Sequence, residues 1–282
     1  MYINSYAKIN FTLEILGKFN SEFHYIKSLM HTISLHDKIT INNSKFLNID
    51  IPKKYINLEE NIVYKTILLV KDEFSIKNWV DVGIEKQIPI SAGLGGGSSN
   101  AAAILLALNK LWKLNMDENK LMNLGALLGS DVPFFIKGGG AIVSGKGETI
   151  SPVNNCNFDE VLLIFPRDIF NFIKNKTKYM YSKITKDHYT DGNITENILS
   201  NLSMITQLNS SDFHNPFLNV LRDVSKDFVD IIYYLEKQNI KRYFLSGAGP
   251  TICVLDFKDK IDIENLCKKF NAEVFLVKNN IL

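Results

Sequence analysis

The chain has 282 residues, 46% of them hydrophobic, and its 32 basic and 30 acidic residues leave a formal net charge of +2. This composition can fill a sizeable core, and the small net charge gives no reason to expect binding to nucleic acid or to a membrane surface. Three widely spaced cysteines, no secretory signal at the N-terminus and no long apolar run lead us to expect a soluble, cytoplasmic protein.

Residue periodicity in the first half of the chain indicates both strands and helices. Residues 7–15 alternate between apolar and polar side chains, which predicts a half-buried strand with one solvated face. Similar alternation predicts strands near 37–41 and 79–88, and apolar spacing predicts a helix over 60–74. After a run of glycines, apolar residues recur at steps of four and three, so we expect an amphipathic helix that begins at the serines near position 98.

The second half repeats the mixture of element types, which favours an α+β layered fold. A composition shift at residues 151–160 is the best candidate boundary and divides the chain into domains 1–150 and 151–282. The first domain is expected to end with a helix closed by Gly129 and a strand over 141–148. The elements expected beyond the boundary are a strand over 160–165, a helix over 176–184, a polar and mobile stretch over 185–197, one helix over 218–239, two strands within 242–257, and a final helix and strand.

The stretch PISAGLGGGSSNAAA, residues 89–103, is the strongest local signal. Its glycines free the backbone for positive φ, and N–H groups at the start of a helix attract anions such as phosphate. A Walker A loop would need a lysine where Ser98 stands, and a dinucleotide fingerprint from Gly93 would need a glycine there. A flexible linker is the alternative, but a linker is not followed by an amphipathic helix with a serine cap, so we favour a phosphate-binding loop.

Three other features gain meaning only beside such a loop. Lys8 and Asn10 lie two apart on the predicted strand and share a face, which alone would indicate a solvated surface. Asp131 precedes an apolar pair, where a helix cap is the more frequent role. The glycine turn in LSGAGPTICVL, residues 245–255, fits a tight hairpin or a second ligand-binding turn. With a nucleoside triphosphate on the loop, the carboxylate could accept a hydroxyl proton and the lysine could offset phosphoryl charge, as in a small-molecule kinase.

Four segments together resemble the GHMP small-molecule kinases: PISAGLGGGSSNAAA, YAKINFTLEILGK, LGSDVPFF and LSGAGPT. The resemblance runs from about Ser5 to the C-terminus. It implies a two-lobed α+β fold, with an N-terminal domain like that of ribosomal protein S5, a C-terminal ferredoxin-like domain and the active site between them. Within the superfamily, the resemblance implies transfer of the γ-phosphoryl group of ATP, with Mg²⁺ carried by ATP, to the 2-hydroxyl of 4-diphosphocytidyl-2-C-methyl-D-erythritol.

The resemblance also implies roles for individual residues. Lys8 and Asp131 would be catalytic, and no residue is assigned to a metal. The substrate would contact Asn10 near its phosphates, His24 and Phe23 at its cytosine ring, and Tyr181 as a further aromatic. The phosphates of ATP would lie on Pro89, Ile90, Ser91, Ala92, Gly93, Leu94, Gly95, Gly96, Gly97, Ser98 and Ser99. The third family motif, which borders both ligands, would comprise Gly247, Ala248, Gly249 and Thr251.

The chain departs from the family pattern at three places. Phe23 replaces a tyrosine, which keeps the ring needed for stacking, and Ala248 replaces a frequent serine. The segment RDIFNFIKNKTKYMY differs from the usual pattern, which is rich in serine and threonine after a proline. Two alternatives stay open: another kinase of the superfamily, and a nucleotide-binding sensor without catalysis. The expected partner is a small cytidine diphosphate compound, with no nucleic acid or membrane, and we expect a monomer or weak homodimer.

Overall fold

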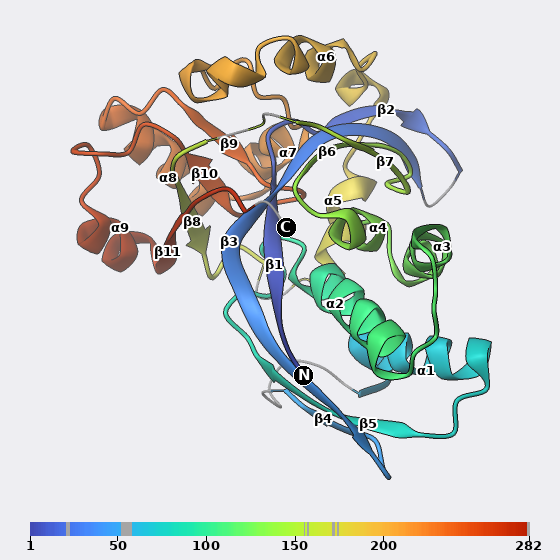
Figure 1. Cartoon of the computed structure of the whole chain (residues 1–282). Coiled ribbons are helices and arrows are strands. Elements are labelled where there is room, and N and C mark those ends of the chain that lie inside the picture. Colours follow the sequence, from blue (N-terminus) through green and yellow to red (C-terminus); the bar gives the residue numbers. More distant parts are fainter. Residues whose placement is uncertain are drawn as a thin grey trace.

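The computed structural model describes residues 1–20, 23–51, 58–154, 156, 158–170, 173 and 175–280 and arranges them around two β-sheets (Figure 1). The first is a seven-stranded sheet in which the long strand β3 pairs with four others. Its strands are β1 (Tyr2–Asn10), β2 (Glu14–Lys18), β3 (His24–Ser44), β4 (Asn48–Asp50), β5 (Trp79–Glu85), β6 (Gly140–Gly145) and β7 (Thr149–Pro152).

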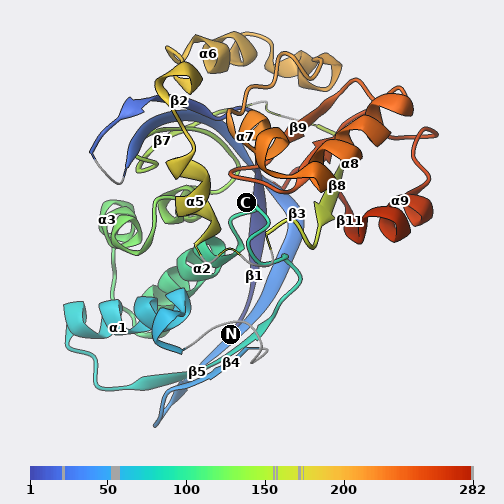
Figure 2. The same cartoon turned by 180° about the vertical axis from the view of Figure 1, so that it is seen from behind.

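Helices cover one face of this sheet (Figures 1 and 2). They are the short 3₁₀ helix η1 (Leu58–Glu60), α1 (Ile62–Phe74), α2 (Gly96–Leu111), α3 (Glu118–Leu128) and α4 (Val132–Lys137). The helix α2 lies directly against β1 and β3, because its buried side includes four alanines and leucines such as Leu105 and Leu108, which are fully buried. This packing fixes the position of the loop that precedes α2.

The second sheet has four antiparallel strands in the order β11-β8-β10-β9. They are β8 (Val161–Pro166), β9 (Tyr243–Leu245), β10 (Ile252–Val254) and β11 (Ala272–Val277). The helical segments of this half are α5 (Lys176–Ser182), η2 (Lys186–His188), α6 (Asn193–Leu199), η3 (Leu202–Gln207), α7 (Phe217–Val224), α8 (Lys226–Lys237) and α9 (Ile263–Phe270). Strand–helix–strand–strand–helix–strand succession with this strand order is the ferredoxin-like arrangement.

A shared core joins the two sheets. Phe11, which follows β1, packs its ring against Phe158, Phe213 and Phe244, with centroids 5.2 to 6.2 Å apart. The chain also returns to the first sheet near its end, because Asn279 forms a bridge with Ile33 of β3. The predicted boundary at 150/151 stays a prediction, since β7 ends at 152 and the connection to β8 is described only in part.

The predicted strand over 7–15 is two strands, and its polar face is not solvated. The backbone leaves the sheet after Asn10, and Leu13 N–H donates to the His214 carbonyl at 2.7 Å. Thr12 and Glu14 are fully buried because α6 covers them: the carboxylate of Glu14 accepts from Thr195 N–H at 2.7 Å. The expectation of a solvated face is therefore wrong.

Two predictions for the second half also need correction. The stretch 185–197, expected to be mobile, forms η2 and the first turn of α6, and Tyr189 bridges Ile15 of β2. The single helix expected over 218–239 is broken at Ser225, whose hydroxyl accepts from Phe228 N–H at 3.2 Å and begins α8. Within the part of the chain that the structure describes, no helix is long and apolar enough to cross a membrane.

Candidate active site

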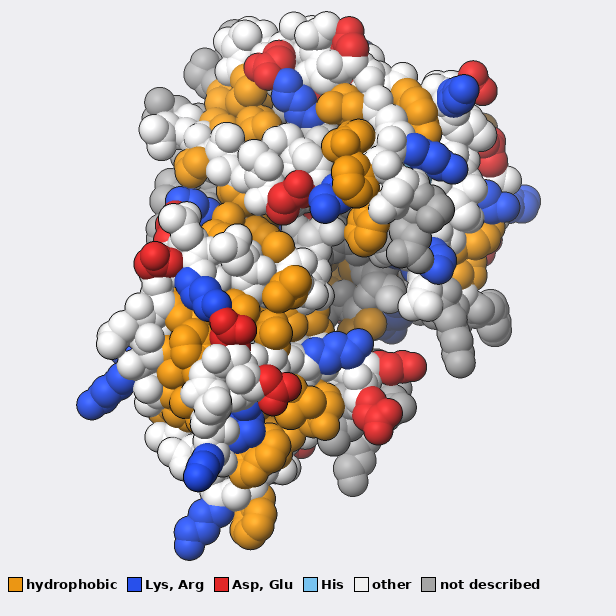
Figure 3. Space-filling view, turned by 90° about the vertical axis from the view of Figure 1, so that its right-hand side faces the viewer, with side chains coloured by type: hydrophobic (Ala, Val, Ile, Leu, Met, Phe, Trp, Pro, Cys, Tyr) orange, Lys and Arg blue, Asp and Glu red, His pale blue; other side chains and the backbone are white. Residues whose placement is uncertain are grey.

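A cleft of about 1330 Å³ lies where the two lobes meet. Individual ligand sites usually measure roughly 300–1,000 Å³, so this cleft has room for two ligands of nucleotide size. Seen from the side of α3, the surface is hollowed, with lysine or arginine side chains on the rim of the hollow (Figure 3). The sequence-predicted residues that line the cleft are Lys8, Asn10, Phe23, His24, Pro89, Ile90, Ser91, Ala92, Gly93, Leu94, Gly95, Gly96, Gly97, Ser98, Asp131, Tyr181, Gly247 and Ala248.

The phosphate loop, residues 89–99, carries the chain from β5 into α2. Gly95, with a left-handed φ of 72°, is the cap of α2, and the helix begins at Gly96 without a side-chain cap. The prediction of a serine cap is therefore wrong. Gly95 occupies the cap position because a glycine backbone tolerates positive φ. The first N–H groups of a helix have no partner within the helix, so this end presents free donors and the positive pole of the helix dipole to the cleft.

The phosphate loop packs tightly on the second glycine loop, residues 247–251. A Cβ on Gly93 would lie 2.3 Å from the Ser246 carbonyl oxygen and 2.9 Å from that of Gly249. The Ser246 hydroxyl donates to the Gly93 carbonyl at 3.0 Å, and Thr251 N–H donates to the Ala92 carbonyl at 3.3 Å. The second loop is therefore a wall of the cleft as well as the connection between β9 and β10.

Lys8, Asn10 and Asp131 form a polar cluster on the wall of the cleft. The Lys8 ammonium lies 3.6 Å from an Asp131 carboxylate oxygen and donates to the Asn10 side-chain oxygen at 2.5 Å. The same Asn10 oxygen accepts from Gly247 N–H at 2.9 Å, so it also holds the second glycine loop. Lys8 is 3% exposed, whereas the Asp131 side chain is 30% exposed and can meet a ligand.

Asp131 stands at the cap position of α4, yet its side chain makes no capping hydrogen bond. The more frequent role that we assigned to an aspartate in this position is therefore wrong. Its carboxylate instead pairs with Lys8 and borders the cleft. This leaves a carboxylate with free acceptor positions beside the phosphate loop, as a general base requires.

His24 and Tyr181 also line the cleft. The His24 side chain is buried, and neither ring nitrogen has a hydrogen-bond partner among the described residues. Burial, and secondarily the charge of Lys18, lowers the pKa of His24, so the ring stays neutral near pH 7 and offers one donor and one acceptor. The Tyr181 ring centroid lies 5.3 Å from that of His24, and Phe23 beside it is 44% exposed. Burial raises the pKa of Tyr181, so its hydroxyl stays protonated.

Three sequence-predicted residues do not reach the cleft wall. Ser99 is buried, and its hydroxyl lies 2.7 Å from that of Ser5 in β1, where it anchors α2 to the sheet. Gly249 lies against Leu221 of α7, and Thr251 is fully buried behind the phosphate loop. These residues support the two loops from behind.

Sequence reasoning missed Lys176, the first residue of α5. Its side chain is 6% exposed, and its ammonium donates to the carbonyl oxygens of Ser91, at 2.8 Å, and Gly249. Burial, and secondarily the charge of Lys8, lowers the pKa of Lys176 to about 7. The one feature of the sequence that could have drawn attention to Lys176 is that its segment, RDIFNFIKNKTKYMY, departs from the family pattern. Other lysines on the cleft wall, Lys18, Lys86, Lys146 and Lys178, belong to no motif.

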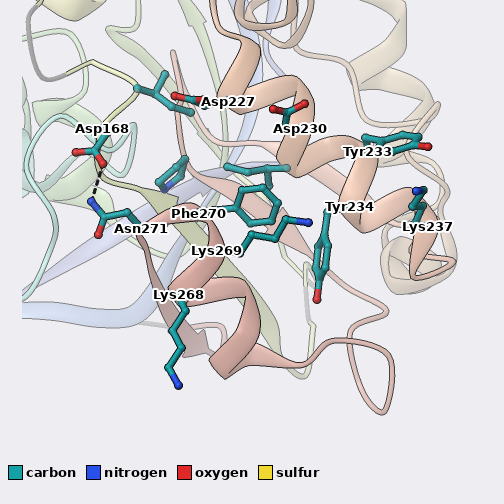
Figure 4. A pocket seen from close by; sticks show the side chains of 13 residues that line it. Asp168, Asp227, Asp230, Tyr233, Tyr234, Lys237, Lys268, Lys269, Phe270 and Asn271 are labelled. Atoms are coloured by element: carbon teal, nitrogen blue, oxygen red, sulfur yellow. Dashed lines mark hydrogen bonds between the residues drawn. The ribbon is translucent and has the colours of Figure 1, made fainter.

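A second hollow of about 540 Å³ lies on the outer side of the second lobe, where α8 and α9 approach each other (Figure 4). Lys269 reaches over the rings of Tyr234 and Phe270, at 5.2 and 5.1 Å from their centroids, and Asn271 donates to Asp168 at 2.6 Å. None of the residues predicted for the site lines this hollow. The candidate site is therefore the cleft between the lobes.

Comparisons with known proteins agree with this fold. The model of the GHMP kinases N terminal domain matches residues 61–139. The chain is 35% identical to a 4-diphosphocytidyl-2-C-methyl-D-erythritol kinase of Clostridioides difficile, covering 99% of this chain and 95% of that protein. It is 34% identical to one of Dehalococcoides mccartyi, covering 93% of each.

Solved structures show the same fold over the whole chain. A crystal structure of 4-(cytidine 5'-diphospho)-2C-methyl-D-erythritol kinase aligns with a TM-score of 0.78 at 24% identity, covering 99% of this chain and 100% of that one. A mevalonate kinase of L. major, in complex with R-mevalonate, aligns with a TM-score of 0.69 at 16% identity, covering 100% and 97%. The predicted two-lobed α+β fold is confirmed, and the chain belongs to the 4-diphosphocytidyl-2-C-methyl-D-erythritol kinase family of the GHMP kinases.

Proposed function

We propose that this kinase transfers the γ-phosphoryl group of ATP to the 2-hydroxyl of 4-diphosphocytidyl-2-C-methyl-D-erythritol, in the cleft between its lobes. One observation carries the proposal: the Lys8–Asp131 pair lies in the same cleft as the phosphate loop and the unpartnered ring of His24. A phosphoryl donor, a proton acceptor and a site for a neutral heterocycle are thereby brought together. The volume of the cleft accommodates both substrates.

The phosphate loop would hold the triphosphate of ATP. Its glycines keep side chains away from the backbone, and the start of α2 supplies unpaired N–H groups. Lys8 and Lys86, each paired with an aspartate, place ammonium groups along the same wall, where Lys176 also lies. We propose that Mg²⁺ arrives bound to the phosphates of ATP, where it neutralises charge that develops during transfer, and we assign it no ligand of this chain.

Asp131 would act as the general base. Its carboxylate accepts the proton of the substrate 2-hydroxyl while that oxygen forms a bond to the γ-phosphorus and the bond from phosphorus to the β,γ-bridging oxygen breaks, which leaves ADP. Lys8 lies between this carboxylate and the Asn10 amide, so it orients the base and offsets charge on the transferring group. Asn10, which also holds Gly247, would lie near the substrate phosphates.

His24 would recognise the cytosine ring of the substrate. A buried neutral imidazole provides one donor and one acceptor, and leaving both unpaired in a buried site is costly unless a ligand satisfies them. Phe23, next to His24 in sequence, and Tyr181, whose ring lies 5.3 Å from that of His24, line the same cleft and offer ring faces for stacking. Mevalonate and homoserine have no ring that these groups could recognise. The protein would work on this small molecule in the cytoplasm, as a monomer or weak homodimer.

The test is turnover with purified protein and ATP. ADP release is measured with 4-diphosphocytidyl-2-C-methyl-D-erythritol, mevalonate and homoserine in parallel, and the product is located by ³¹P NMR. We expect turnover with the cytidine compound alone and a new phosphomonoester at the 2-oxygen. Turnover of mevalonate or homoserine, with none of the cytidine compound, would refute the proposed acceptor. Nucleotide binding without turnover of any acceptor would favour a sensor.

A further inference from the structure

Lys176 is a buried lysine with no carboxylate partner among the residues the structure describes. Its side chain is 6% exposed, and its two hydrogen-bond acceptors among these residues are neutral carbonyl oxygens, of Ser91 in the phosphate loop and Gly249 in the second glycine loop. The ring of Phe170 lies 5.7 Å from the ammonium. Burial of an ammonium without a charged partner is costly and favours the neutral amine.

The surroundings of Lys176 favour the neutral amine further. From β1, Lys8 contributes a like charge that adds to the effect of burial in lowering the pKa of Lys176 to about 7. Asp131, from the segment before α4, is engaged with Lys8, and Tyr181 on α5 keeps its proton because burial raises its pKa. The remaining charged groups of the cleft wall are Lys18, Lys86, Lys146, Lys178 and Glu60, of which Lys86 is paired with Asp37.

We propose that Lys176 is a positioning residue that ties the phosphate loop to the second glycine loop and takes up a proton when a nucleotide's phosphates occupy the phosphate loop. The inference rests on the proposed function, because the phosphates of the nucleotide provide the missing negative charge. A neutral amine can donate to the two carbonyls with both of its hydrogens, whereas the ammonium retains a third hydrogen for a phosphate oxygen. Binding of the nucleotide and protonation of Lys176 therefore favour each other.

The sign of the effect follows from the lowered pKa. Above about pH 7 the free protein carries mostly neutral Lys176, and the phosphates raise its pKa toward the ordinary lysine value of 10.5. Nucleotide binding then takes up close to one proton at about pH 8, and clearly less at about pH 6, where Lys176 is already charged. A lysine that merely held two loops together would give no such uptake.

The experiment is isothermal titration of the purified full chain with ADP and Mg²⁺ at about pH 8, in buffers of different ionisation enthalpy. The variants are Lys176→Met, which removes the charge, and Lys176→Arg, whose guanidinium is charged at every pH used. Lys183→Met, on an exposed lysine just after α5 that does not line the cleft, is the matched control. Thermal unfolding of each variant is measured first, and the arginine variant keeps the test valid if the methionine variant does not fold.

We expect uptake close to one proton per ADP for the native chain and for Lys183→Met, and uptake near zero for both Lys176 variants. Lys176→Met should also bind ADP at least tenfold more weakly. Binding of ADP by the native chain without proton uptake, or equal uptake in the Lys176 variants, would overturn this inference and leave the proposed function standing. No binding of ADP or ATP by the native chain would overturn both.

Discussion

Replacement of Gly93 by alanine tests how the two glycine loops build the cleft. Gly93 has a φ of +85°, which costs a residue with a Cβ about 1–3 kcal/mol. The new Cβ would lie 2.3 Å from the Ser246 carbonyl oxygen and 2.9 Å from that of Gly249, and backbone atoms cannot turn aside as a side chain does. The loops must separate, which breaks the bonds that the Ser246 hydroxyl and Thr251 N–H donate, worth about 0.5–1.5 kcal/mol each.

These contributions lower the free energy of unfolding by roughly 2–6 kcal/mol and move the phosphate loop. The assay is urea unfolding followed by tryptophan fluorescence, together with ADP affinity for the variant that remains folded. Gly97→Ala is the control for the unfolding measurement alone, because its Cβ would meet only Ile62, at 3.9 Å, and alanine is favoured over glycine within a helix by up to about 1 kcal/mol. An unchanged free energy of unfolding and unchanged ADP affinity in Gly93→Ala would refute the packing argument.

Three further predictions concern His24 in the cleft and the Ser225 cap of α8. His24→Ala should raise KM for the cytidine substrate by about 5- to 150-fold, corresponding to about 1–3 kcal/mol for two lost hydrogen bonds, with KM for ATP unchanged in the same assay. Because the pKa of His24 is lowered, the native KM for this substrate should stay flat down to the ordinary histidine value of 6.5 and rise only below it; a rise between pH 8 and 7 would contradict a neutral ring. Ser225→Ala should lower the free energy of unfolding by about 1 kcal/mol through loss of the α8 cap, and an unchanged urea midpoint would exclude that role.

Local patterns allowed much of the fold to be predicted. The helix over 60–74 is found as α1, and the helix closed by Gly129 ends there, because apolar spacing and glycine act within a few residues. The start of α2 was misplaced because glycine can cap a helix by its backbone alone, whereas the serines pack against β1 and the cleft. The layer arrangement came from the family resemblance, since strand order depends on contacts between distant segments.

The limits of sequence reasoning are clearest where the two lobes meet. The alternation predicts that Thr12 and Glu14 lie on a solvated face, but Thr195, more than a hundred residues later, covers them. Its hydroxyl lies against that of Thr12, and its N–H donates to one carboxylate oxygen of Glu14. The sequence indicates only that Lys176 is a polar residue of a helix. Nothing near it in sequence shows that the carbonyl oxygens of Ser91 and Gly249 will accept hydrogen bonds from its ammonium. Burial of a polar side chain is decided by what packs over it, and alternation along one strand cannot show that.

The most direct test of the central claim is a single-turnover measurement with Asp131→Asn. The variant keeps the size of the side chain and removes the carboxylate that would accept the proton of the 2-hydroxyl. We predict that phosphoryl transfer to 4-diphosphocytidyl-2-C-methyl-D-erythritol slows by about 10²- to 10⁴-fold while the Kd for ADP changes little. A transfer rate equal to that of the native chain would contradict Asp131 as the base of this kinase.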